Sequence, residues 1–126
     1  AAIRNRCVSV IAHPTGRLIG EREAYAVDME AVLREAAKYG VAMEINAYPL
    51  RLDLNDSHIR TAKEYGVALV ISTDAHVTMQ LDTMIYGVSL ARRGWAEQGD
   101  ILNAREYGML VERLKSCRAK KAGDAG

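Results

Sequence analysis

The sequence predicts an α/β protein in which short parallel strands alternate with helices. Apolar runs rich in Val, Ile and Ala alternate with stretches whose apolar residues follow helical spacing. In addition, KYGVAMEIN at residues 38–46 and EYGVALVIS at residues 64–72 repeat a helix end, a glycine and a strand. The two segments either descend from one duplicated unit, or they form the same common αβ turn independently. Either way, such units are typical of parallel βα folds, as an open sheet or a (βα) barrel.

Three short apolar runs are predicted to be buried strands. They are partly β-branched, and each one leads into polar or turn-forming residues. The first run stops at Pro14 and Gly16, the second leads to Asn46 and Pro49, and the third delivers Asp74. The three expected strands are residues 7–12, 41–45 and 68–73.

The segments between and after the strands are predicted to be helices. Residues 28–39 have apolar side chains at helical spacing, with Asp28 placed to cap the start and Gly40 to end the helix. A second helix is expected to begin near Asn55 or Asp56 and to stop at Gly66. The other expected helices are residues 79–92, 100–105 and 109–117.

The composition fits a globular domain with no preference for a charged partner. The 126 residues are 49% hydrophobic, and 17 basic and 16 acidic side chains leave a net charge of +1, so overall charge does not indicate nucleic-acid binding. No run approaches the roughly 18 apolar residues of a membrane helix and no signal peptide is evident, so we expect a cytoplasmic protein. Cys7 and Cys117 are too far apart for metal-ligand spacing and are expected to be reduced thiols.

Side chains that could bind a metal ion follow two of the expected strands. In parallel βα folds, ligands bind at the carboxyl ends of strands, because the loops there converge. His13 follows the first strand, and Asp74 and His76 follow the third. Carboxylate and imidazole together suit Zn, Mn or Fe, which lower the pKa of bound water enough to supply hydroxide. Alternatively, Asp74 caps the next helix, His76 is a polar loop residue, and His13 belongs to a turn.

Two arginines near the same strand ends could contact phosphate. The planar guanidinium groups of Arg17 and Arg51 match a phosphate group with two parallel hydrogen bonds. Both are also candidate partners for Glu44, because a carboxylate inside a buried strand needs a partner. His58 lies in the second expected helix, and we expect it on the solvated face.

Four ordered segments carry a family resemblance. They are AHPTGR at 12–17, EINAYPLRLDL at 44–54, STDAH at 72–76 and YGVSLARRGW at 86–95. Together they resemble the polymerase and histidinol phosphatase (PHP) domain at the C-terminus of bacterial family X DNA polymerases, over roughly residues 5–105. The resemblance implies a distorted (βα)7 barrel with a trinuclear centre of Mn or Zn that acts as a phosphoesterase. In family X polymerases this implies 3′-5′ exonuclease activity and processing of DNA ends in repair.

Carried over by position, the resemblance implies that His13, Asp74 and His76 are metal ligands. His13 matches the histidine of the third family motif, and Asp74 and His76 match the Asp-x-His of the fourth. The family's first motif, His-x-His, and its later His and Glu ligands have no counterpart in this sequence. We therefore expect the chain alone to bind divalent metal weakly or partially and to have little exonuclease activity.

Three interpretations of the whole chain follow. In the first, residues 1–117 are the C-terminal portion of a PHP domain and residues 118–126 a disordered tail, with DNA, the missing N-terminal half of the barrel and a polymerase domain as partners. A closed βα barrel takes about 200 to 250 residues, so the chain would be about half of one. In the second, it is a stand-alone binding or assembly module whose homo-oligomer covers exposed strand edges. In the third, it belongs to a phosphatase of a small ester such as histidinol phosphate, but RLDL and ARRGW favour the polymerase branch.

Overall fold

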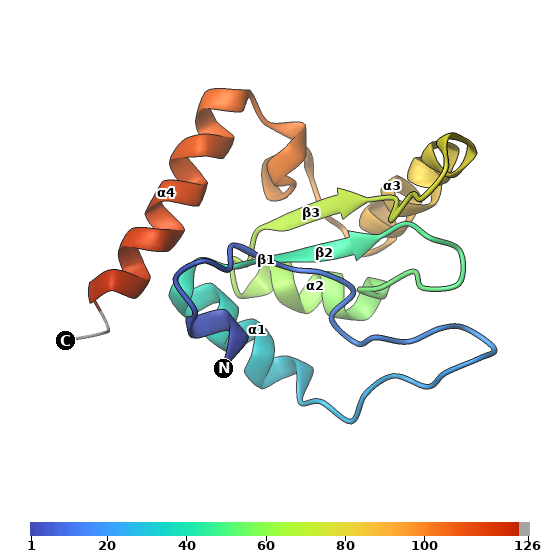
Figure 1. Ribbon diagram of the computed structural model, residues 1–126, viewed down its shortest axis with the longest axis horizontal. Coiled ribbons are helices and arrows are strands. Elements are labelled where there is room, and N and C mark those ends of the chain that lie inside the picture. Colours follow the sequence, from blue (N-terminus) through green and yellow to red (C-terminus); the bar gives the residue numbers. More distant parts are fainter. Residues whose placement is uncertain (124–126) are drawn as a thin grey trace.

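The computed structural model describes residues 1–123, and at its centre is a sheet of three parallel strands (Figure 1). The strands are β1 (Val10–Ile11), β2 (Ala42–Asn46) and β3 (Leu69–Ser72), with β2 in the middle. Both strand pairs are parallel. The predicted α/β class with three parallel strands is confirmed, and the arrangement is consistent with part of a βα barrel.

The register between β2 and β3 matches the sequence repeat. Met43 pairs with Leu69 and Asn46 pairs with Ser72, and in each pair the second residue lies 26 positions after the first. KYGVAMEIN and EYGVALVIS have the same offset, because they begin at residues 38 and 64. The two repeated segments are therefore neighbours in the sheet, at equivalent positions.

Within residues 1–123, four α-helices lie along the sheet or beyond its ends (Figure 1). The first two pack against each other, and the first also contacts β2. The third lies beyond the carboxyl ends of β2 and β3, which both contact it, and the fourth contacts the first near the amino ends of the strands. These helices are α1 (Met29–Tyr39), α2 (Asp56–Glu64), α3 (Met84–Arg93) and α4 (Tyr107–Gly123).

The helix ends follow the predicted signals. The carboxylate of Asp28 accepts a hydrogen bond from the backbone N–H of Ala31 at 3.0 Å and caps α1. Asn55 caps α2 in the same way. Gly40 and Gly66 have φ values of 70° and 69°, a left-handed conformation that glycine adopts without a steric penalty. Both chain reversals from helix to strand therefore depend on a glycine.

The core lies between the sheet and these helices. Most of its fully buried side chains are apolar, as the composition predicts, and α3 approaches the sheet closely at Gly87. A Cβ atom there would lie 2.6 Å from Cγ2 of Ile71 and 2.8 Å from Cβ of Ala47, so only glycine fits. The largest aliphatic side chains of the core include Leu33, Met43, Ile45, Leu54, Ile59 and Leu69.

Two predicted elements differ in extent from the observed ones. The first strand was expected over 7–12, but β1 covers only Val10–Ile11, because only these two residues pair with β2, at Ala42 and Met43. The helix expected over 79–92 begins as a 3-10 helix, Thr78–Thr83, and becomes α3 afterwards. That first part buries no side chain, so packing does not favour a regular α-helix there.

The C-terminal region also differs from the expectation. Shorter 3-10 helices precede α4, which continues through residues 118–123, and residues 124–126 lie outside the described part. Lys121 is 4% exposed, and its Nζ donates a hydrogen bond to the backbone carbonyl of Asn5 at 2.9 Å. This contact holds the end of α4 against the N-terminal segment. The 3-10 helices are Ala2–Arg4, Thr78–Thr83, Gln98–Asp100 and Leu102–Ala104.

Two expectations from composition can be compared with the structure. Cys7 and Cys117 are both free thiols, the first exposed and the second buried in the core. Among the helices within residues 1–123, none combines the length and the apolar character needed to cross a lipid bilayer.

Candidate functional site

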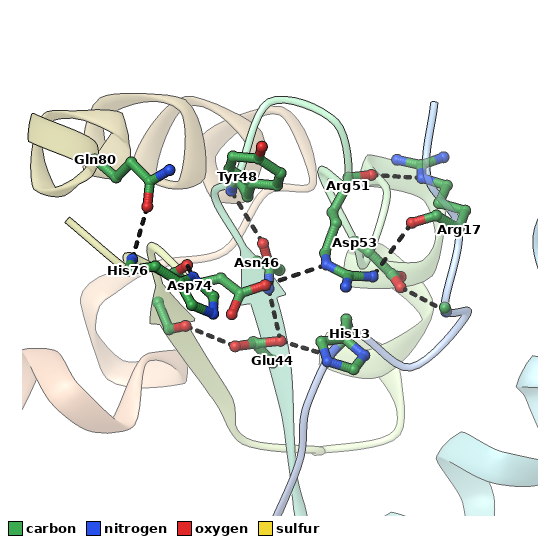
Figure 2. A network of polar contacts seen from close by, with 12 residues as sticks. His13, Arg17, Glu44, Asn46, Tyr48, Arg51, Asp53, Asp74, His76 and Gln80 are labelled. Carbon is green, nitrogen blue, oxygen red and sulfur yellow. Dashed lines mark hydrogen bonds and ion pairs between the residues drawn. The ribbon is translucent and has the colours of Figure 1, made fainter. Parts of the chain in front are cut away.

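The side chains predicted to bind metal lie at the carboxyl ends of the strands. His13 follows β1, and Asp74 and His76 follow β3. Figure 2 shows Glu44 and Asn46, from the end of β2, between these two groups. The structure therefore brings all three strand ends into one polar network, as parallel topology requires.

Glu44 connects the three strand ends (Figure 2). Its carboxylate is 7% exposed, and its Oε2 accepts hydrogen bonds from the backbone N–H of His13 and from Nδ2 of Asn46, the latter at 3.2 Å. Its Oε1 accepts a hydrogen bond from the Ser72 hydroxyl at 2.6 Å. The prediction that Arg17 or Arg51 is the partner of Glu44 is wrong, because uncharged donors at the ends of all three strands bind this carboxylate.

Asp74 is held through one of its oxygens. Its Oδ2 accepts hydrogen bonds from Nδ2 of Asn46 at 3.2 Å and from Nε of Arg51 at 3.1 Å. The side chain of Asp74 remains 29% exposed. Asp74 is not a helix cap, because the N-cap residue of the following 3-10 helix is Val77. These contacts orient Asp74 and leave Oδ1 as the oxygen that a metal ion would bind.

One ring nitrogen of His76 is hydrogen-bonded to the backbone, which leaves the other ring nitrogen for a metal ion. Its Nδ1 lies 2.8 Å from the backbone carbonyl of Asp74, which accepts a hydrogen bond and so keeps the proton on Nδ1. The lone pair is then on Nε2, and His76 is exposed. Metal-bound histidines usually donate from the other ring nitrogen in this way. The backbone N–H of His76 also binds Oε1 of Gln80 at 2.6 Å, which holds the loop.

Two of the predicted ligands have an unusual backbone conformation. The φ values of His13 and Asp74 are 29° and 54°, in the left-handed region that few residues other than glycine adopt. Leu52 and Trp95 share it. Strained backbone conformations of this kind concentrate at functional sites, where contacts with the surrounding structure hold the backbone in place. Here the hydrogen bond that the His13 N–H donates to Glu44, and the bonds that Asp74 accepts from Asn46 and Arg51, provide that restraint.

The two arginines predicted to bind phosphate organise a loop at this edge. The Nε of Arg17 donates to the backbone carbonyl of Arg51 at 2.6 Å, and its Nη2 donates to the carbonyl of Leu52. Arg51 forms its ion pair with Asp74, and its side chain is 17% exposed. Arg51 thus lies directly beside a predicted metal ligand, whereas Arg17 supports the loop that carries Arg51. Phosphate binding by either arginine stays a prediction.

Sequence reasoning did not find the role of Asp53. This residue is fully buried, and its Oδ2 accepts hydrogen bonds from the backbone N–H groups of Thr15 at 2.8 Å and Gly16 at 3.2 Å. The carboxylate therefore binds the backbone of the loop that follows His13. Its one sequence signal is an acidic residue between two leucines in RLDL.

His58 lies near Asp53 and is half-buried, whereas we expected it on the solvated face of its helix. Within the described residues its Nδ1 is buried without a hydrogen-bond partner. Burial lowers the pKa of His58 below its usual value; the charge of Arg17 acts in the same direction and that of Asp53 opposes it.

The donor set fits a divalent metal ion in type, but not in number. Nε2 of His76, Oδ1 of Asp74 and the ring of His13 are borderline and hard ligands of the kinds that Zn and Mn accept. Within residues 1–123, however, no three His, Cys, Asp or Glu side chains gather closely enough to hold one ion. A complete coordination sphere would need ligands besides these.

Comparisons with known proteins agree with the expected family. No protein-family model matches the chain. The DNA polymerase/3′-5′ exonuclease PolX of Bacillus subtilis (strain 168) is 51% identical over 114 residues, which are 90% of this chain and 20% of that protein. The resemblance to bacterial family X DNA polymerases is confirmed.

Probable phosphatases are also similar to this chain over most of its length. A probable phosphatase of Shewanella sp. (strain ANA-3) is 37% identical over 115 residues, which are 86% of this chain and 43% of that protein. A second, from Thermoanaerobacter sp. (strain X514), is 28% identical over 129 residues, 98% of this chain and 50% of that protein. The chain thus spans a fifth of the polymerase and half or less of these phosphatases.

Proposed function

We propose that this chain supplies part of the metal-binding site of a PHP phosphoesterase, which in the whole protein removes nucleotides from DNA 3′ ends. The observation that supports this most directly is the placement of His13, Asp74 and His76 at adjoining strand ends, with the tautomer of His76 set for coordination through Nε2. The relationship to an exonuclease-bearing polymerase supports the DNA substrate.

Each residue of the site has a distinct part in this proposal. A bound Mn or Zn ion supplies activated water and stabilises charge on the phosphate. Asp74 and His76 would hold the ion from the end of β3, and His13 would hold it from the end of β1. Arg51, whose Nε pairs with Asp74 and whose Nη1 donates to the backbone carbonyl of Arg17 at 3.5 Å, would offer Nη2 to a phosphate oxygen. The partners of the whole protein are then DNA, the rest of the barrel and a polymerase domain.

A small phosphate ester is the second candidate substrate. The probable phosphatases share 37% and 28% identity with the chain over most of its length. We favour DNA because the polymerase is more similar, at 51% identity. A 3′-labelled single-stranded oligonucleotide and histidinol phosphate, offered to the same preparation, distinguish the two substrates.

Calorimetric titration with Mn²⁺ and Zn²⁺ tests the metal site. We expect weak, partial binding that the Asp74→Asn and His76→Ala variants abolish and that Glu64→Gln, an exposed substitution on α2, leaves unchanged. Sub-micromolar binding of several ions per chain would show that the ligand set is more complete than proposed. Equal binding by wild type and Asp74→Asn would place the metal elsewhere.

A complementation experiment tests the activity. The chain is mixed with a polypeptide that carries the His-x-His motif and the other missing ligands, and nuclease activity is measured with Mn²⁺ present. We expect activity only in the mixture, and none when the chain carries His13→Ala. A mixture with correctly folded components and bound metal that hydrolyses neither DNA nor the phosphate ester would contradict the proposed function.

A further inference from the structure

We propose that Glu44 is a positioning residue of this site: its buried carboxylate sets the place of His13 directly and the place of Asp74 through Asn46. Glu44 itself binds no metal in this proposal. The inference rests on the proposed function, because His13 and Asp74 matter here as metal ligands.

The first observation is that Glu44 binds one donor from each strand end. It lies on the central strand, β2, and accepts hydrogen bonds from the His13 N–H after β1 and from the Ser72 hydroxyl of β3. A buried carboxylate with charge-assisted bonds holds its donors more firmly than a neutral acceptor does. The backbone of His13 is thereby fixed at its left-handed φ of 29°, which determines where its ring can lie.

The second observation is that Asn46 passes this restraint on to Asp74. Asn46 is fully buried, and its Oδ1 accepts a hydrogen bond from the backbone N–H of Tyr48 at 3.0 Å. That bond fixes the orientation of the amide, so Nδ2 points at the two carboxylates (Figure 2). Nδ2 lies 3.2 Å from Glu44 Oε2 and 3.2 Å from Asp74 Oδ2. One amide group thus spaces the two carboxylates.

The third observation is that the fold does not require a carboxylate at this position. Val70 on β3 is the register partner of Glu44 and occupies the equivalent place in the second repeat. The same helix, glycine and strand therefore form there with an apolar side chain. A buried charge is costly in free energy. Its presence in only one of the two repeats therefore indicates a role specific to that position.

The experiment replaces Glu44 in two steps. Glu44→Gln keeps the shape and can still accept from His13, whereas Glu44→Val introduces the residue of the second repeat and removes every acceptor. Ile45→Val is the matched control, because it loosens the same strand from the core side without touching the network. Glu64→Val tests loss of a glutamate on an exposed surface.

Two signals are measured on the full chain. Mn²⁺-induced broadening of the NMR signals of His13, Asp74 and His76 gives an apparent metal affinity, even at millimolar concentrations. Amide hydrogen exchange of His13 without metal reports its bond to Glu44. We expect Glu44→Val to weaken Mn²⁺ binding about tenfold or more, the range for residues that orient metal ligands, and to accelerate His13 exchange. Glu44→Gln gives an intermediate effect, and both controls retain wild-type affinity.

The outcomes separate this inference from the proposed function. Wild-type affinity and wild-type His13 exchange in Glu44→Val would overturn the inference, as would an equal loss in Ile45→Val. If Glu44→Val does not fold, Glu44→Gln decides by the same criteria. If Mn²⁺ broadens none of the three signals in the wild type, the proposed function fails instead. The metal-free exchange of His13 and the signals of Asp74 then still show whether Glu44 positions them.

Discussion

The two helix-to-strand repeats are alike at their turns and different at their strand ends. Both turns share Tyr-Gly-Val-Ala, with glycine φ values of 70° and 69° and a buried valine after each glycine. In the paired strands, however, Glu44 lies opposite Val70 and Asn46 lies opposite Ser72. The shared residues form the fold, and the residues that differ build the polar network. The comparison therefore separates the residues that form the turns from those that build the polar network.

The largest expected effect comes from the shared core. Ile45 and Ile71 are register partners with exposed fractions of 0% and 8%. Replacing either with alanine leaves a cavity, and we expect each variant to lose about 3 kcal/mol in the free energy of unfolding. Urea denaturation monitored by circular dichroism measures this. A loss below about 1 kcal/mol in one variant only would show that the two strands are not equivalent parts of the core.

The next effect comes from making the two strand ends alike. Asn46→Ser places in β2 the residue that β3 has, and its hydroxyl is too short to bridge Glu44 and Asp74. We expect a loss of about 2 kcal/mol, since two carboxylates lose a donor. Ser72→Thr, which keeps a hydroxyl, is the control and should stay close to wild type. If Asn46→Ser unfolds at the wild-type urea concentration, the amide does not bridge the carboxylates.

A smaller effect, equal in both repeats, is expected at the glycines. Alanine at Gly40 or Gly66 must adopt a positive φ, which costs about 1 kcal/mol. A Cβ atom at Gly66 meets open space, and at Gly40 its closest contact is 3.6 Å from Lys120, an ordinary distance. The same denaturation experiment compares the two variants. A much larger loss for Gly40→Ala would mean that α4 restrains the first turn more than the second.

The smallest effect concerns pH. The repeats are offset by 26 residues, so His58 on α2 is equivalent to Val32 on α1. His58→Val therefore makes α1 and α2 alike at this position. Burial lowers the pKa of His58 in the folded chain below its usual 6.5, so the unfolded chain binds the proton first. Stability from this group is therefore complete above the unfolded pKa and falls as the pH decreases below it.

Thermal unfolding at about pH 7.5 and about pH 5.5 measures this dependence. We expect the wild type to lose more of its melting temperature over this interval than His58→Val does. Parallel losses in the two proteins would show that His58 titrates alike in the folded and unfolded states.

The fold was predictable because its signals are local. The caps at Asp28 and Asn55 and the turn at Gly40 depend on neighbouring residues, and the repeat predicts the parallel pairing. Element lengths were less predictable. The extent of β1 depends on which of its residues pair with β2, and that of α4 depends on contacts with the N-terminal segment.

The site was predictable in position but not in its connections. Placement at strand ends gave His13, Asp74 and His76 a common edge. The partners of Glu44 depend on the register of three strands that are far apart in sequence, so charge alone suggested an arginine instead. The hydrogen bonds of Asp53 with the loop after His13 depend on a second loop that returns to β2. Neither the loop path nor the left-handed backbone of His13 and Asp74 has a local sequence signal.

The most direct test of the metal site is a crystal structure of the chain soaked in millimolar MnCl₂, with anomalous scattering recorded at the manganese edge. We predict a peak within coordination distance of His76 Nε2 or Asp74 Oδ1, and its loss in Asp74→Asn. Anomalous peaks confined to other parts of the surface, or an unchanged peak in Asp74→Asn, would contradict a metal site at these strand ends.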